Sequence, residues 1–179
     1  MRTGIGVRQR DVQLMALSTC DLSDKYGDKA RVLAPGFRHF GGKKQFHGPV
    51  VTVRCPEDNS RLKELASTPG EGRVLVVDGA GSLRYALLGD MIGKLVLDHG
   101  WAGVVVHGAV RDTVALGALD LGVMALGVTP RRSLKNGEGQ VGLVVEIAGA
   151  VCASGDLLFA DEDGIVVIDA ALLSDEDKG

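Results

Sequence analysis

Three charged residues in an otherwise apolar part of the chain have the types and the spacing of a reactive site. Asp90 follows Gly89, and Arg111 and Asp112 stand together after 20 intervening residues. Carboxylates are hard oxygen ligands that a divalent cation prefers, and a guanidinium binds the carboxylate of an anionic substrate. The pattern therefore predicts a cleft that holds a divalent cation and an anion together.

Each of these residues also has a purely structural interpretation. Asp90 and Asp112 both stand where a helix is expected to begin, and an aspartate there commonly accepts hydrogen bonds from the first backbone N–H groups. Arg111 could instead form an internal ion pair with a nearby aspartate. From the residues alone, cap and ligand both stay open for the aspartates, as do ion pair and anion receptor for Arg111.

The elements that must position these residues follow from the hydrophobic pattern. Residues 74–81 form an apolar run that ends in glycines, and residues 104–106 form a second run, as is typical of inner strands of an α/β sheet. Apolar residues on one face predict a helix over 90–99. Ligands of open α/β sheets bind outside the carboxyl ends of the strands, and Arg111 directly follows such an end.

The rest of the chain is predicted to continue as a mixed α/β domain with a β-rich second half. Phe37, Phe40 and Phe46 fall within ten residues and predict a core corner or a subunit contact. The other expected elements are a capped helix opening 18–30, strands at 49–54 and 123–126, helices at 57–66 and 113–119, strands within 141–147, 150–153 and 164–168, and a hairpin turn at 161–164.

Composition limits the classes of protein to consider. The 179 residues are 45% hydrophobic and 24% charged, which suits a single globular domain with a sizeable core. Only 4% are aromatic, so binding of nucleic-acid bases by stacking is not expected. Cys20, Cys55 and Cys152 are widely spaced without a CxxC motif, and predict buried thiols in a reducing cytoplasm rather than disulfides or a zinc site.

The boundaries of the domain follow from the ends of the hydrophobic pattern. We expect an N-terminal extension over 1–17, one domain over 18–169 and an acidic tail over 170–179. No run approaches the roughly 20 apolar residues of a membrane span, so neither a membrane nor direct nucleic-acid contact is predicted. Residues 1–63 hold 12 basic against 6 acidic residues, which suits a solvated face better than an RNA-binding surface. Residues 156–177 hold 8 acidic and no basic ones, which suits either a solvated tail or docking to a basic partner.

Other candidate chemistry in the sequence has simpler explanations. His107 could be a general base, yet no Ser/His/Asp or Cys/His constellation accompanies it. The Gly79-x-Gly81 turn lacks the third glycine of a dinucleotide site, where Arg84 stands instead. Acids at 161–163 could bind calcium but suit a hairpin turn better, and Lys94 is expected to be solvated rather than to form a Schiff base.

Several motifs, in order along the chain, resemble those of one known family. They are Phe37-x-x-Phe40-Gly41-Gly42, Asp58-Asn59-Ser60, the run over 74–84, Gly108-Ala109-Val110-Arg111-Asp112, and Gly155-Asp156 through Asp163-Gly164. From about residue 19 to 168 the chain resembles proteins of the regulator of ribonuclease E activity A type. These proteins share a fold with metal-dependent 4-hydroxy-4-methyl-2-oxoglutarate aldolases.

The resemblance implies a fold, an assembly and a set of site residues. The fold is a swivelling β/β/α, phosphohistidine-domain-like sandwich, assembled as a homotrimeric ring with sites between subunits. In the aldolase branch the residue matching Asp112 binds a divalent metal, usually Mg²⁺ with Mn²⁺ as the alternative, and the residue matching Arg111 binds substrate. Asp90 contributes to catalysis, and backbone N–H groups over Gly89, Asp90, Met91 and Ile92 hold a carboxylate.

Two functions follow from the resemblance. The first is a metal-dependent lyase that forms pyruvate from a 4-hydroxy-2-oxo dicarboxylate and decarboxylates oxaloacetate. The second is a non-enzymatic inhibitor that binds a ribonuclease or an RNA helicase. One residue departs from the aldolase pattern: Ala115 stands where an acid is found three positions after the Arg-Asp pair. Loss of that acid predicts weakened activity on the branched aldol.

Overall fold

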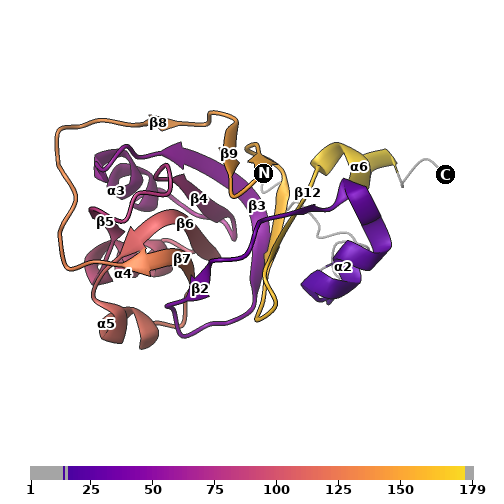
Figure 1. Cartoon of the computed structure of the whole chain (residues 1–179), viewed down its shortest axis with the longest axis horizontal. Coiled ribbons are helices and arrows are strands. Elements are labelled where there is room, and N and C mark those ends of the chain that lie inside the picture. The colour runs from indigo at the N-terminus through magenta and orange to yellow at the C-terminus, as the bar shows by residue number, and fades with distance from the viewer. Residues whose placement is uncertain (1–13, 15, 176–179) are drawn as a thin grey trace, which may run out of the picture.

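The computed structural model describes residue 14 and residues 16–175 (Figure 1). Its helices are α2 (Thr19–Tyr26), the 3₁₀ turn η1 (Gly27–Lys29), α3 (Ser60–Ala66), α4 (Asp90–Asp98), α5 (Thr113–Gly117) and α6 (Ala170–Asp175). Its strands are β1 (Arg31–Val32), β2 (Arg38–His39), β3 (Phe46–Arg54), β4 (Val74–Asp78), β5 (Ala86–Leu88), β6 (Gly103–Val110), β7 (Gly122–Val128), β8 (Gln140–Val141), β9 (Val145–Ile147), β10 (Ala150–Cys152), β11 (Leu157–Ala160) and β12 (Ile165–Ile168).

Most of the strands belong to one mixed sheet. The strand order is β1-β12-β11-β3-β4-β6-β7-β2, with β5 paired to β6 and β8 paired to β3, while β9 and β10 form a separate hairpin. Strands β3, β4, β6 and β7 run parallel to one another. Among the described helices, none has the length and hydrophobicity needed to cross a membrane.

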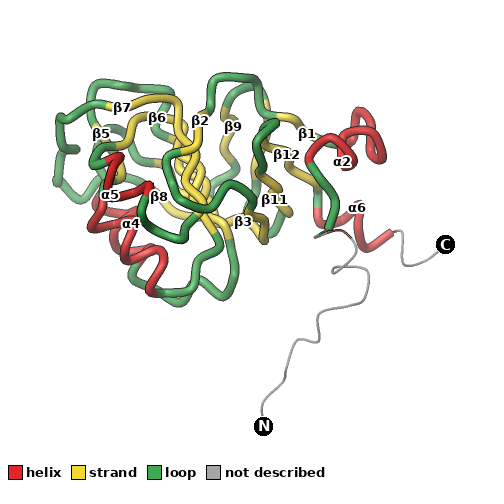
Figure 2. The backbone as a smooth tube through the Cα atoms, turned by 90° about the horizontal axis from the view of Figure 1, so that it is seen from below, coloured by secondary structure: helices red, strands yellow, loops and turns green. Residues whose placement is uncertain are grey.

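Side chains of the parallel strands alternate between two layers. Leu75 and Val77 of β4 face a core shared with α3, α4 and α5, whereas Val74 and Val76 face a core shared with β9, β10 and β11. All four are fully buried, and each contributes about 1.5–3 kcal/mol to folding. Helices α4 and α5 lie together on one side of the sheet, while α2 and α6 lie at the other end of the molecule (Figures 1 and 2). This is the single mixed α/β domain that the sequence predicted.

Strand β3 gives the sheet its curl. Its first residues pair antiparallel with β11, from Phe46 opposite Ala160, and its later residues pair parallel with β4. The Phe46 ring lies over Gly103 and Gly122, neighbours on β6 and β7, where an added Cβ would come within 2.3 and 2.1 Å of the ring. The two glycines therefore leave the space that the Phe46 ring occupies.

The three nearby phenylalanines do not form the single cluster that the sequence suggested. Phe40 packs against the core beneath the helices, whereas Phe46 and Phe37 belong to the opposite core. Phe40 is separated from Phe37 because strand β2, Arg38–His39, lies between them and the chain changes layer there.

The ends of the described chain pack against each other. Helix α2 has a capping box, in which Ser18 and Asp21 exchange hydrogen bonds, and its Leu22 lies in a third core cluster. Leu173 of α6 is buried in the same cluster. Residues 170–179 were expected to form a tail without regular structure; Ala170–Asp175 are helical instead, because Leu172 and Leu173 supply an apolar face. The extension predicted over 1–17 lies almost entirely outside the described residues.

Sequence patterns placed most elements correctly and their ends less well. Helix α3 begins at Ser60 rather than near residue 57, and β6 continues to Val110 although only 104–106 were predicted from the apolar run. His107 and two glycine or alanine positions interrupt that run, but the backbone pairing with β4 and β7 carries the strand through them. Of the cysteines, Cys55 and Cys152 are buried as expected, whereas Cys20 is exposed on α2.

Candidate active site

Two adjacent parallel strand ends bring the predicted residues together. Leu88, the last residue of β5, pairs with Val110, the last residue of β6. The N–H of Arg111 then donates to the carbonyl of Leu88 over 2.9 Å. Since Gly89 and Arg111 are the next residues on each strand, the start of α4 and the Arg111-Asp112 pair lie side by side.

Asp112 lies against the N-terminus of α4 rather than capping its own helix. As the residue before α5, it makes no side-chain cap hydrogen bond there, and its backbone is left-handed, with φ 55° and ψ 42°. One carboxylate oxygen accepts a long, 3.4 Å hydrogen bond from the N–H of Asp90. The structural interpretation of Asp112 as the cap of α5 is therefore wrong, and its left-handed backbone turns the carboxylate toward Asp90.

Gly89 is the residue that permits this close approach. A Cβ at this position would lie 2.4 Å from Oδ2 of Asp112 and 3.0 Å from Cγ of Arg111. The backbone of Gly89 is extended, with φ −137° and ψ −164°. Space rather than backbone conformation requires glycine here.

Arg111 forms a long, partly exposed ion pair with Asp112, one of the two interpretations that the sequence left open. Its Nε lies 3.4 Å from Oδ2 of Asp112, and both side chains are more than a third exposed. An exposed pair of this kind contributes about 0–1 kcal/mol to stability. Within the part of the chain that the structure describes, the Arg111 side chain makes no other hydrogen bond or ion pair, so its two terminal nitrogens can bind an anion.

All six residues predicted for the site line one open pocket of about 250 Å³: Gly89, Asp90, Met91, Ile92, Arg111 and Asp112. Met91 is 74% exposed and Ile92 is buried. Asp90 accepts a 2.7 Å hydrogen bond from the N–H of Met91 through its own carboxylate. The structure thus brings the predicted residues together, and their individual roles remain predictions.

The opposite wall of this pocket was not predicted. It comprises Asn59, Lys63, Ala86, Arg132, Ser133 and Lys135. Three of these are cations, which together with Arg111 outnumber the two acids of the pocket. The loop over 129–139 carries no hydrophobic period, so only its run of basic residues, Arg131-Arg132-Ser133-Leu134-Lys135, could have indicated a binding role. The excess positive charge favours an anionic ligand.

The donor set suits a hard cation that keeps most of its water. No three His, Cys, Asp or Glu side chains within the described ranges group closely enough to enclose a metal ion. A structural zinc or a calcium ion needs more protein ligands than Asp112 and Asp90 provide. Magnesium binds through one or two carboxylates plus waters and substrate oxygens, and the exposed Asp112 carboxylate fits that requirement.

Other residues with possible chemistry lie elsewhere. His107 does not line this pocket; its ring lies near Phe37, and burial lowers its pKa, opposed by the charge of Asp78. Lys94 is solvated and pairs with Asp98 at 2.9 Å, as predicted. Residues 161–164 form the hairpin turn between β11 and β12, and the Gly79-x-Gly81 turn leads into β5 rather than into a nucleotide-binding helix.

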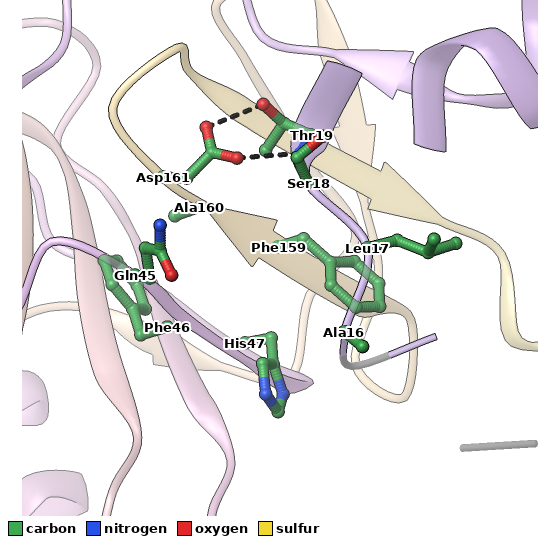
Figure 3. A pocket seen from close by; sticks show the side chains of 10 residues that line it. All are labelled: Ala16, Leu17, Ser18, Thr19, Gln45, Phe46, His47, Phe159, Ala160 and Asp161. Atoms are coloured by element: carbon green, nitrogen blue, oxygen red, sulfur yellow. Dashed lines mark hydrogen bonds between the residues drawn. The ribbon is translucent and has the colours of Figure 1, made fainter. Parts of the chain in front are cut away.

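A second cavity, of about 150 Å³, lies between β3, β11 and the start of α2 (Figure 3). Its acid, Asp161, accepts 2.7 Å hydrogen bonds from both the N–H and the hydroxyl of Thr19. His47 lies apart from Asp161 in this cavity, and its pKa is lowered by burial and by Lys43. Because these contacts anchor α2 on the β-hairpin, this cavity has a structural explanation and the first pocket is the better candidate.

Comparison with known proteins identifies the family of this chain. The family model "RraA-like: Aldolase/RraA" matches residues 19–167. A protein of Alkalilimnicola ehrlichii that bears the provisional name 4-hydroxy-4-methyl-2-oxoglutarate aldolase is 56% identical over 153 residues, which are 86% of this chain and 95% of that protein.

Solved structures show the same fold. The RNA-processing inhibitor RraA of Thermus thermophilus has a TM-score of 0.83 and 44% identity, over 86% of this chain and 93% of that one. A Geobacillus kaustophilus protein named S-adenosylmethionine:2-dimethylmenaquinone methyltransferase has a TM-score of 0.84 and 42% identity, over 88% and 98%. A family model matches most of the length of this chain, which has close relatives both in sequence and among solved structures. This chain therefore belongs to the RraA-like family.

Proposed function

We propose that this protein is a magnesium-dependent lyase that releases pyruvate from a 4-hydroxy-2-oxo dicarboxylate and from oxaloacetate. One observation carries the proposal: Arg111, Asp112 and the N-terminus of α4 meet in a single cation-rich pocket. A helix N-terminus and a guanidinium both bind carboxylates, and the partly exposed carboxylate of Asp112 beside them binds a hard cation. The provisional aldolase name of the 56% identical relative supports the same reaction class.

In the proposed reaction, Asp112 would hold the magnesium ion, which supplies Lewis-acid polarisation of the substrate's 2-oxo group. The substrate's 1-carboxylate would replace the side chains of Asp112 and Asp90 as acceptor of the N–H groups at the start of α4, and Arg111 would donate toward the oxygen that gains negative charge. A water oriented by Asp90 relays the 4-hydroxyl proton to the Asp90 carboxylate, C4 becomes the carbonyl carbon of the second product as the C3–C4 bond breaks, and the electron pair of that bond forms the enolate of pyruvate. Return of the proton to C3 then completes pyruvate. Stabilisation of this developing charge is the main catalytic task.

Oxaloacetate follows the same path without the proton transfer from a hydroxyl group. Its C3–C4 bond breaks with loss of carbon dioxide, and the electron pair again leaves the enolate of pyruvate. Ala115 is exposed on α5 and supplies no acid beside Asp112. We therefore expect oxaloacetate, which needs no base for a 4-hydroxyl, to be a better substrate than the branched aldol.

Arg111→Lys tests the role of the guanidinium. Lysine keeps the charge but lacks the planar two-pronged donor, so recognition of the enolate should lose roughly 1.5–3 kcal/mol. We expect kcat/KM for oxaloacetate, measured as magnesium-dependent pyruvate release, to fall at least about tenfold. Arg61→Lys is the matched control, because Arg61 pairs with Glu64 on the surface of α3 at 2.8 Å and lies outside the pocket.

The outcome separates an enzyme from a binding protein. Unchanged kinetics in Arg111→Lys would remove Arg111 from the mechanism. A wild-type protein without chelator-sensitive pyruvate release from either substrate would reject the lyase altogether.

The second candidate function is inhibition of an RNA-processing enzyme, a ribonuclease or a helicase. The observation in its favour is the 44% identity to a structure named as an RNA-processing inhibitor, together with the missing acid at Ala115. Inhibition would use the outer surface and not the pocket, so Arg111→Lys should leave it unchanged while lyase activity falls.

A homotrimer remains a prediction from the family resemblance. Met91 and Val114 are 74% and 91% exposed at the starts of α4 and α5, beside the pocket. Exposed apolar side chains in this position favour a contact with a second subunit. Sedimentation equilibrium at micromolar concentration should give three times the chain mass of 18.7 kDa, and a value equal to the chain mass would contradict the prediction.

A further inference from the structure

The loop between β7 and β8, residues 129–139, forms the basic wall of the pocket and is held in place by a buried carboxylate. Arg132 and Lys135 from this loop line the pocket beside Lys63 of α3. Within the described part of the chain, no acid pairs with Arg132 or Lys135. Cations that have no acidic partner and share one pocket are suited to an anion from solution.

Ser133, which lies between these cations, provides a second and independent observation. It lines the same pocket, is only 5% exposed, and its hydroxyl has no hydrogen-bond partner among the described residues. A buried hydroxyl without a hydrogen-bond partner destabilises the folded protein. An oxygen of a bound ligand would satisfy it.

Asp58, the second residue before α3, anchors the loop through its side chain. It is fully buried, and its carboxylate accepts hydrogen bonds from the N–H groups of Ser60, at 2.8 Å, and of Asn136. Burial alone would raise the pKa of Asp58, but hydrogen bonds from Ser60, Asn136 and Glu138 outweigh burial and lower it. The carboxylate therefore stays ionised at neutral pH and links the loop, at Asn136, to the start of α3, at Ser60.

Further backbone contacts place the loop against the site. The N–H of Leu134 donates to the carbonyl of Glu57 at 2.9 Å, and the N–H of Ala86, at the start of β5, donates to the carbonyl of Arg131 at 2.7 Å. The Ser60 hydroxyl accepts from the N–H of Gly137 at 3.2 Å. The loop is thus tied both to the strand that leads to Gly89 and to the start of α3.

We infer that Arg132, Ser133 and Lys135 form a subsite for the second carboxylate of a 2-oxo dicarboxylate, and that Asp58 is the positioning residue of this subsite. The inference rests on the proposed function, in which Arg111 and α4 receive the 2-oxo acid end. The subsite distinguishes dicarboxylates from pyruvate, which lacks the second carboxylate. Asp58 acts through the loop and touches no ligand.

The test compares binding of 2-oxoglutarate and of pyruvate by calorimetry in the presence of magnesium. Both carry the 2-oxo acid end, only 2-oxoglutarate carries a second carboxylate, and neither has a 4-hydroxyl to be cleaved. The wild type should bind 2-oxoglutarate at least about tenfold more tightly than pyruvate. The double variant Arg132→Ala with Lys135→Ala should lose that preference and keep its affinity for pyruvate.

Asp58→Asn should reduce the same preference at least about tenfold with little change in pyruvate affinity, because Asn retains the shape but not the charge. Combined with the Arg132 and Lys135 changes it should cause no further loss of preference, since the three residues act through one subsite. Asp156→Asn is the matched control: Asp156 is buried, accepts from the N–H of Ala153 at 2.9 Å and pairs with Arg31 at 3.0 Å, outside the pocket.

Each outcome is decisive. A preference that survives loss of Arg132 and Lys135, or a wild type without preference, overturns the subsite. Equal losses for both ligands in Asp58→Asn overturn the positioning role, and Ser60→Ala tests that role with a milder change if Asp58→Asn does not fold. Pyruvate release from oxaloacetate is assayed separately: tight 2-oxoglutarate binding without turnover rejects the lyase and retains the subsite.

Discussion

Asp112→Asn is expected to abolish magnesium-dependent pyruvate release while leaving the free energy of unfolding almost unchanged. Asparagine has the same shape and tolerates the left-handed backbone that Asp112 adopts, with φ 55°. It lacks the charge that a hard cation requires. We expect kcat/KM to fall at least about a thousandfold, or ~4 kcal/mol of transition-state stabilisation.

A magnesium titration of activity together with a denaturant titration measures both effects. If Asp112 served only to cap α4 through the N–H of Asp90, the variant would retain activity and lose about 0.5–2 kcal/mol of stability. Asp98→Asn is a suitable control, because Asp98 is exposed, pairs with Lys94 and does not line the pocket.

Gly89→Ala should damage the site through a single methyl group. The extended backbone of Gly89 accepts alanine without strain, but the new Cβ would lie 2.4 Å from Oδ2 of Asp112 and 3.0 Å from Cγ of Arg111. Both side chains must move by a large fraction of an ångström to relieve that contact. A displacement near 1 Å can cost about a hundredfold in rate, and we expect a fall in kcat/KM of that order.

Gly117→Ala provides the matched comparison for this variant. Gly117 lies in α5, and an added Cβ would meet nothing closer than the carbonyl oxygen of Phe40 at 3.7 Å. Activity near the wild-type level in Gly117→Ala and a large loss in Gly89→Ala would tie the effect to the contact with Asp112. Wild-type kinetics in Gly89→Ala would mean that the positions of Asp112 and Arg111 are unimportant.

Two signals in the sequence predicted half of the candidate site. Arg111 and Asp112 follow an apolar run that predicts an inner strand, and ligands of α/β sheets bind at such strand ends, whereas the roles of Gly89, Met91 and Ile92 were implied by the family resemblance. Strand β5, which places Gly89 and Asp90 beside Arg111, was not predicted. The wall formed by Arg132 and Lys135 comes from an irregular loop whose position depends on Asp58, 74 to 77 residues earlier in the chain. No local periodicity records a long-range hydrogen bond of that kind.

The fold was predictable to a similar degree and for a similar reason. The side chains of β4 and β6 are buried on both faces of the sheet, which produces the continuous apolar runs from which these strands were predicted. The helix Ala170–Asp175 was missed because acidic residues dominate its end, although Leu172 and Leu173 precede them. The division of the three phenylalanines between two cores depends on the course of the chain around β2, between Phe37 and Phe40, which proximity in sequence does not reveal.

The edges of the large sheet limit how copies of this chain can associate. The strand order begins with β1 and finishes with β2, and each of these strands is only two residues long. Such short edges offer few unpaired N–H and C=O groups to a strand of another molecule, which protects against edge-to-edge aggregation. An oligomer of this protein would therefore be held together by side-chain surfaces, such as the one around Met91 and Val114, and not by extension of the sheet from one subunit into the next.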